Sequence, residues 1–342
     1  MEHMLMLQPV NNATASDSSK LQKEFITDIA YEEDQVSTDK PFIQANTIGS
    51  TLGTIKKDHI IPVFVKDNEP CISHYEFIET TASVVAHVYQ GEHILHPAVR
   101  LSHPVKGRVP QAKDKPASQL LEHESTIYYE RLAFIIEIAS VYDEIDGNRL
   151  SLCVGGVKAY NLDNLYARKG GDEHFKIFAG FQNKVCTNMC VWTDGTMIDL
   201  KVTSMGQLRA CIQNLLENYN AQHHLFHLNE FSEYNLTEHQ FAQLLGRCRM
   251  YQHLPQDLKK EIPQLMYGDQ QLGTVVRDFY RDNSFCRMPD GSISLWRLYN
   301  LFTNANKATY IDQFIERGAN AFSLVYHLKQ AMKDKAFTWY LS

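Results

Sequence analysis

Basic side chains gather in one stretch of a chain whose net charge is −7. Between residues 100 and 115, five basic residues stand against one acidic residue, and prolines at 104, 110 and 116 oppose regular structure. An exposed basic loop can neutralise nucleic-acid phosphates, with an affinity that falls as the salt concentration rises. The alternative, which the sequence slightly favours, is a solvated loop that keeps a neighbouring strand edge from aggregating. The five residues are Arg100, Lys106, Arg108, Lys113 and Lys115.

A second candidate combines aromatic rings with positive charge. Tyr160 and Tyr166 flank Lys158, Arg168 and Lys169, in a segment predicted to be a partly basic hairpin tip. Single-stranded nucleic acid binds where stacking faces lie beside a positive groove, and each stacked base contributes about 1–3 kcal/mol. Because aromatic residues make up 11% of the chain, such neighbours also arise by chance. Ordinary packing of tyrosine in strands is therefore the preferred interpretation, by about two to one.

The stretch GRCRMYQ places Arg247 and Arg249 in a predicted helix between apolar residues. At the pitch of an α-helix, residues two apart point about 200° away from each other, so both cannot face solvent equally. We expect one of them to bind a carboxylate or a ligand, and the ion-pair interpretation is preferred.

The sequence lacks the motifs of the common enzyme classes. It contains no HExxH, GxSxG, Walker-type or dinucleotide-binding motif, and Gly155-Gly156 lies within a strand, not at a strand-to-helix turn. Cys186 and Cys190 have no further zinc ligands at suitable spacing, which favours buried thiols. For the HHLFH stretch at 223–227, a solvated helix end is preferred over a metal site. We therefore expect no catalytic residue, no metal and no cofactor, and an enzyme is the least supported class.

A strand-rich core between residues 125 and 203 must position these candidates. Four apolar, strand-like runs alternate with turns, and the turns at 146–148 and 194–195 contain the Asp-Gly pairs that tight hairpins need. Before this core, Ser73 and Glu76 form a capping box that opens a helix. The pattern predicts a curved antiparallel sheet crossed by one packed helix.

After residue 205 the hydrophobic period becomes helical, and Thr237 with Gln240 forms another capping box. The predicted fold class is therefore α+β: a curved antiparallel sheet with a packed helix and a C-terminal helical subdomain. We expect residues 1–40 to be disordered or loosely attached. We expect residues 41–204 to form the sheet core and residues 205–342 to form the helical subdomain packed on it.

Composition also bears on the cellular location that we expect for the protein. No run of about 18 apolar residues occurs, so we expect no membrane span. The seven cysteines are odd in number and contain no CxxC pair, which favours reduced thiols in a cytoplasmic protein.

Several segments resemble uncharacterised protein families of bacterial phages, plasmids and conjugative elements. They include GNRLSLCVGGVKAYNLDNLY, GFQNKVCTNMCVWTDG, LTEHQFAQLLGRCRMYQ and ISLWRLYNLFTNANKATYID, and the resemblance covers about residues 41 to 335. It implies a mobile-element setting and brings no established activity. The shared elements are a strand ending in Val-Cys-x-Asn, here Val185, Cys186 and Asn188, and a late helix with Trp296, Tyr299, Asn300 and Thr303.

The leading hypothesis is a mobile-element accessory protein that binds nucleic acid, with single-stranded DNA favoured. By architectural analogy, a curved sheet with a helix and basic loops is the shape of single-strand annealing proteins, which often assemble into rings, so a homo-oligomer is expected as well. The alternative is a protein-interaction or regulatory module that acts on a host or element-encoded partner without catalysis.

Overall fold

The computed structural model describes residues 41–58, 71–160, 172–192 and 197–342, which belong to one compact unit. The segment 1–40, most of the predicted hairpin tip and the predicted turn at 194–195 lie outside the described residues.

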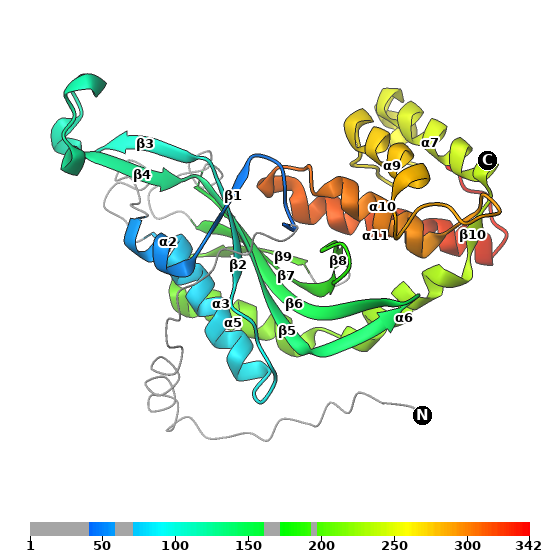
Figure 1. The fold of residues 1–342 in the computed structure, drawn as a ribbon, viewed down its shortest axis with the longest axis horizontal. Coiled ribbons are helices and arrows are strands. Elements are labelled where there is room, and N and C mark those ends of the chain that lie inside the picture. The colour runs from blue at the N-terminus through cyan, green and yellow to red at the C-terminus, as the bar shows by residue number, and fades with distance from the viewer. Residues whose placement is uncertain (1–40, 59–70, 161–171, 193–196) are drawn as a thin grey trace. The chain divides into compact units, whose positions relative to one another are not determined.

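A seven-stranded antiparallel sheet forms the centre of the described chain (Figure 1). The strands follow the order β1-β2-β5-β6-β7-β8, and β9 pairs with the part of β7 that β8 leaves free. The prediction of an α+β fold is confirmed. The strands are β1 (Thr47–Ser50), β2 (Ala98–Ser102), β5 (Arg131–Ile145), β6 (Asn148–Ala159), β7 (Glu173–Asn183), β8 (Met189–Val191) and β9 (Met197–Val202).

The hairpin between β5 and β6 follows from its turn residues. Asp146 and Gly147 have φ angles of 49° and 73°, so both central residues of the two-residue turn are left-handed. This geometry matches the right-handed twist of the flanking strands, and Asp-Gly adopts it readily. A register shift between Ile138 and Tyr142 interrupts β5, and such a bulge increases the local bend of a strand.

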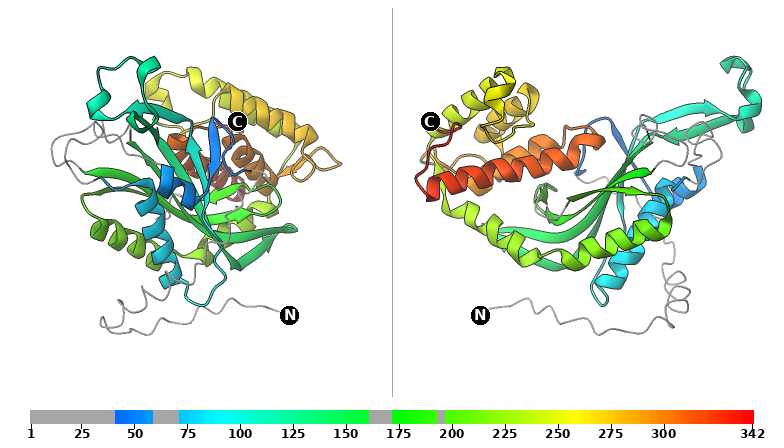
Figure 2. Two further views of the ribbon diagram at one scale, coloured as in Figure 1. Left: turned by 60° about the vertical axis from the view of Figure 1, so that its left-hand side comes forward. Right: turned by 180° about the vertical axis from the view of Figure 1, so that it is seen from behind.

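The central strands are buried on both faces, which explains why their sequences are almost continuously apolar. On one face, the Phe134 ring of β5 meets the Phe77 ring of α3 (His74–Val88), with centroids 5.1 Å apart. On the other face, Ala133 and Ile135 share a core cluster with Phe314 of α11 (Ile311–Lys333). Figures 1 and 2 show α3 and α11 on opposite sides of the sheet.

Both predicted capping boxes are present. The Ser73 hydroxyl accepts a hydrogen bond from the Glu76 amide, and the Glu76 carboxylate accepts one from the Ser73 amide at 2.7 Å. Thr237 and Gln240 make the same reciprocal pair before α7 (Glu238–His253). Each box satisfies two backbone donors that a helix start leaves without partners, so these ends are encoded locally.

The last part of the described chain is mainly helical, and α10 (Leu295–Asn306) lies at its centre. Ten of the twelve residues of α10 are buried, because α9 and α11 both pack against it. A helix that is apolar on most sides must be covered in this way.

None of the helices in the described ranges has the length and apolar content needed to traverse a bilayer. The remaining helices are α2 (Leu52–Asp58), α5 (Met205–Asn218), α6 (Ala221–Glu230), α8 (Gln256–Lys259) and α9 (Asp269–Arg281), and the short strands β10 (Asn235–Leu236) and β11 (Ile293–Ser294) pair with each other.

The basic stretch is only partly the loop that the prolines suggested, because its basic residues up to Arg108 lie in strands and only those after Arg108 lie in irregular turns. Strand β3 (Pro104–Arg108) pairs with β4 (Ser125–Tyr129) in a separate two-stranded sheet, joined at its tip by short 3-10 turns. We call residues 104–129 the arm, and Figure 1 shows it projecting from the main sheet. The predicted single run from Ser125 to Ile145 is therefore two strands, β4 and β5, which belong to different sheets. The sequence pattern could not reveal this break, because alternating and continuously apolar segments are both typical of strands. Two strands in succession therefore look like one long strand.

The close packing of β6 between β5 and β7 requires a glycine at position 155. A Cβ atom there would lie 2.4 Å from the Phe134 carbonyl oxygen and 2.6 Å from the Phe178 ring. We expect Gly155→Ala to lower the free energy of unfolding by about 1–3 kcal/mol, because neighbouring strands must move apart. Gly246→Ala is the control, since a Cβ at this α7 position meets nothing within 4 Å. It should raise the free energy of unfolding by about 0.5–1 kcal/mol. Urea denaturation followed by circular dichroism measures both, and equal stabilities would contradict this account.

Candidate functional site

The pairing register of the arm separates its side chains into two faces. Lys106 lies opposite Ile127 and Arg108 lies opposite Ser125, so these side chains share one face. Val105 lies opposite Tyr128 on the other face. One side of the ribbon is therefore basic and partly apolar.

Within the arm, the basic residues differ in how they are held. The Arg108 guanidinium donates to the carbonyl oxygens of Lys113 and Lys115, and Lys115 forms an ion pair with Glu124. The Lys115 partnership is also the main reason that the pKa of the Glu124 carboxyl is lowered. Lys106 and Lys113 are exposed. Arg108 and Lys115 thus stabilise the tip of the arm, whereas the charged groups of Lys106 and Lys113 lie at the exposed surface.

Arg100 belongs to the main sheet and not to the arm. On β2, its guanidinium donates to the Thr47 carbonyl oxygen at 2.8 Å and to the Thr47 hydroxyl at 3.0 Å. Partial burial lowers the pKa of Arg100 because desolvation disfavours its charge. These contacts tie β2 to β1, which is a structural use of the side chain.

Lys158 is fully buried. Its ammonium lies 2.7 Å from the Glu173 carboxylate and 3.9 Å from the centre of the Phe175 ring. The same carboxylate accepts the backbone amide of Ile72 at 3.0 Å, just before α3 begins. A lysine in this position joins β6, β7 and the start of α3 and presents no charge at the surface. The other members of this candidate, Tyr166, Arg168 and Lys169, lie outside the described residues.

The two arginines of α7 behave as the helical spacing predicted. Arg249 forms an ion pair with Asp269 at 3.0 Å, and both side chains are mostly exposed. Arg247 lies over the Trp339 ring at 5.1 Å and donates to the Ser342 carbonyl oxygen. The expected carboxylate partner is therefore confirmed for Arg249. In Figure 1 and in the right-hand view of Figure 2, α7 and the arm lie at opposite ends, so these groups do not form one groove.

The structure brings together the two elements that carried the family resemblance. The Asn188 side-chain amide donates to the Asn300 backbone carbonyl at 2.9 Å, and the Asn183 amide donates to the Asn300 side-chain oxygen at 3.2 Å. The Lys307 ammonium, just after α10, binds the Cys186 carbonyl oxygen in the same turn after β7. A turn after β7 and the buried helix α10 are thus joined by amide hydrogen bonds, although more than 100 residues separate them in the chain.

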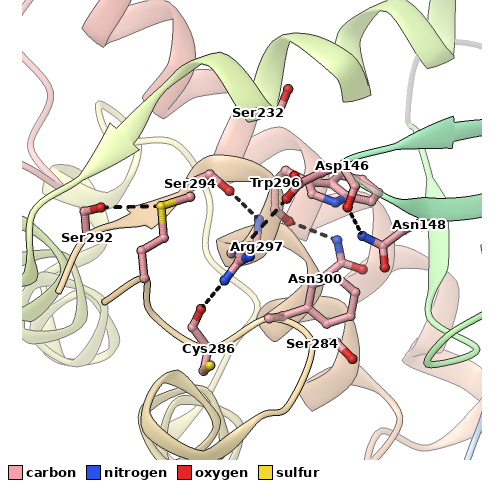
Figure 3. Close-up of polar contacts among 12 residues, drawn as sticks. Asp146, Asn148, Ser232, Ser284, Cys286, Ser292, Ser294, Trp296, Arg297 and Asn300 are labelled. Atoms are coloured by element: carbon pink, nitrogen blue, oxygen red, sulfur yellow. Dashed lines mark hydrogen bonds and ion pairs between the residues drawn. The ribbon is translucent and has the colours of Figure 1, made fainter. Parts of the chain in front are cut away.

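An arginine on α10 extends this polar junction to the end of the main hairpin (Figure 3). The Arg297 Nε atom lies 3.8 Å from the Asp146 carboxylate, and its Nη1 atom donates to the Cys286 carbonyl oxygen at 3.0 Å. The Asn148 amide donates to the Asp146 carbonyl at 2.9 Å. The β5–β6 turn is therefore attached to the C-terminal helices through Arg297.

A polar pocket of about 310 Å³ opens beside the junction. Three side-chain amides contribute to its lining, and the Asp282 carboxylate in the lining is already bound by the backbone amides of Ser284 and Phe285. Such a lining can hydrogen-bond a small polar group but contains no paired acid and base for proton transfer. The lining residues include Gln44, Cys186, Asp282, Asn283, Asn304 and Lys307.

The histidine stretch at 223–227 is not a solvated helix end, contrary to the prediction. His224 is fully buried on α6, and its Nδ1 atom lies 2.9 Å from the Tyr219 hydroxyl. Desolvation lowers the pKa of His224 to about 3, so it stays neutral. The apolar positions Leu225 and Leu228 in the same helix are the sequence signal that pointed to burial.

One family is similar to almost the whole chain. The family model described as "Domain of unknown function, B. Theta Gene description (DUF3871)" matches residues 24–341. No curated protein and no solved structure matches the chain.

The Lys158–Glu173 pair predicts a large and coupled stability effect. Lys158→Met alone leaves a buried carboxylate without its cation and should cost about 3–5 kcal/mol of unfolding free energy. The double variant Lys158→Met/Glu173→Gln should recover part of this loss, because it removes the buried charge. As a matched control, Asp269→Asn breaks the exposed pair with Arg249 and should cost at most about 1 kcal/mol. A double-mutant cycle by chemical denaturation measures the coupling, and strictly additive losses would disprove it.

Proposed function

We propose that this chain binds nucleic acid through the arm, with single-stranded DNA as the favoured ligand. The chain belongs to the DUF3871 family of domains of unknown function. The observation that carries the proposal is the ribbon face on which Lys106, Arg108 and Ile127 lie together. The mobile-element setting, the cytoplasmic location, the annealing-type role and the homo-oligomer belong to the same proposal.

The exposed charges of the arm suit phosphate contact. Lys106 and Lys113 project into solvent from a ribbon that stands away from the main sheet. A two-stranded ribbon reaches along a nucleic-acid backbone, and each neutralised phosphate releases counterions and strengthens binding at low salt. Ile127, which is 41% exposed on the same face, offers apolar contact to unstacked bases.

The charge of the arm limits how strong this binding can be. Residues 104–129 contain four basic and three acidic side chains, and one of the acids, Glu124, is paired with Lys115. Two exposed lysines contact few phosphates, so we expect weak and strongly salt-dependent binding rather than tight sequence-specific recognition. Lys158 is excluded from this proposal because it is buried. Arg247 and Arg249 would require a ligand that also reaches α7.

The double variant Lys106→Gln/Lys113→Gln tests the arm directly. Fluorescence anisotropy with labelled single-stranded and double-stranded oligonucleotides, at about 50 mM and about 200 mM salt, should show weaker binding of the variant. Each lost phosphate contact should lower the slope of log affinity against log salt by about 1. Lys260→Gln is the control, because Lys260 is an exposed lysine at the end of α8 and not part of the arm. This variant should bind as the original protein does.

Two results would end the nucleic-acid proposal. One is the absence of binding to any oligonucleotide at about 50 mM salt, where phosphate-driven affinity is strongest. The other is an unchanged affinity and salt slope for the double lysine variant.

A protein partner is the second candidate, and exposed aliphatic side chains on the arm favour it. Val105 is 36% exposed and Leu121 is 54% exposed, although a two-stranded ribbon has little core of its own. Large exposed apolar side chains on a projecting element are typical of protein contacts. Val105→Ser/Leu121→Ser should then abolish a nuclease-resistant association in a pull-down and leave oligonucleotide binding unchanged. Partners that disappear on nuclease treatment would contradict this second candidate.

A further inference from the structure

Two histidine side chains on α6 face each other through the same ring atom. The Nε2 atoms of His223 and His227 are 3.1 Å apart, and the two residues lie one helical turn apart. Two imidazole ligands of a tetrahedral zinc ion, each about 2.0–2.1 Å from the metal, have nitrogens roughly 3.3 Å apart. The spacing therefore fits a shared cation between the rings.

The opposite edge of His227 is already arranged as in metal sites. Its Nδ1 atom lies 3.1 Å from the Glu230 carboxylate. A carboxylate on the far nitrogen fixes the tautomer and leaves Nε2 with a lone pair for a metal. Glu230 is itself held by the ammonium of Lys329, a buried residue of α11, at 2.6 Å. Contacts from two helices thus fix the His227 ring.

The surroundings keep the rings in place and leave one side open. The Trp192 ring lies 5.1 Å from His223 and 5.5 Å from His227, and the Tyr326 ring lies 5.1 Å from His227. His223 is exposed, so ions reach the pair from solvent. His224 points elsewhere, since it is buried against the Tyr219 hydroxyl.

We propose that His223 and His227 form a two-imidazole chelate for a borderline divalent transition-metal ion. Imidazole suits Zn²⁺ and Cu²⁺, and for nitrogen donors Cu²⁺ is the most tightly bound of the divalent first-row ions. No group of three or more His, Cys, Asp or Glu side chains suited to a metal occurs within the described ranges. The bound ion therefore keeps open positions, which water or a donor from a ligand fills.

The net charge near the site makes binding moderate in strength. Glu230 lies between the histidine pair and two ammonium groups, Lys329 at 2.6 Å and Lys333 at 3.8 Å. Its negative charge offsets the repulsion that these lysines exert on a cation. The chelate is thus supported by one carboxylate and does not include it as a ligand.

Titration of the full chain with Zn²⁺, followed by calorimetry, tests the chelate. His223→Asn should lose one binding event or weaken it at least tenfold, while the chain stays folded because position 223 is exposed. The chain has 15 histidines, so His239→Asn, at an exposed position of α7, controls for weak surface binding and should leave the titration unchanged. Electron paramagnetic resonance with Cu²⁺ should show two coordinated imidazole nitrogens, reduced to one in His223→Asn.

Glu230→Gln provides an independent readout, because loss of a carboxylate behind a metal-bound histidine lowers metal affinity about 10–100-fold. Circular dichroism must first show that this variant folds, since Lys329 loses its carboxylate partner. The proposal is overturned if the original protein binds no Zn²⁺ at millimolar concentration. It is also overturned if His223→Asn binds Zn²⁺ with the same stoichiometry and affinity, in which case the two rings share only a proton.

Discussion

The close approach of α3 to the main sheet is the constraint on which the rest of the structure depends. A Cβ at Gly156 would lie 2.6 Å from the Phe77 ring, and a Cβ at Gly155 would meet the Phe134 backbone. Gly155 admits the Phe178 ring on the face opposite to α3. Gly156 lets the Phe77 ring of the helix share one layer with the Phe134 and Phe175 rings on the α3 face. Without this layer the long strands could not be covered on the α3 face while α11 covers the opposite face.

Buried charges and amides then determine how the parts are joined. Lys158 and Glu173 tie two strands to the start of α3, and Glu230 ties α6 to α11. Asn300 ties α10 to the turn after β7. Except for Lys158 and Glu173, which are 15 residues apart, the partners in these contacts come from distant parts of the sequence. Losing one partner leaves a desolvated polar group behind. Polar contacts of this kind favour one arrangement of sheet and helices over alternatives.

Burial and ion pairing also use several of the basic side chains that the sequence suggested as ligand contacts. Arg100 and Lys158 are used inside the sheet, and Arg249 is paired on α7. The arm retains exposed lysines and is separated from the main sheet by a change of strand pairing. The histidine pair on α6 is a second polar feature, which lies on a different element from the arm.

Local chemistry was predictable from the sequence, because it depends on neighbours within a few residues. The capping boxes at Ser73 and Thr237, the Asp146-Gly147 turn and the α+β class are of this kind. Tertiary structure alone decided the burial of Lys158, the split between β4 and β5, and the meeting of Asn188 with Asn300. These features depend on which distant residues share a layer of the core. A single sequence does not contain that information in its local pattern, because burial and partner choice are properties of the packed chain.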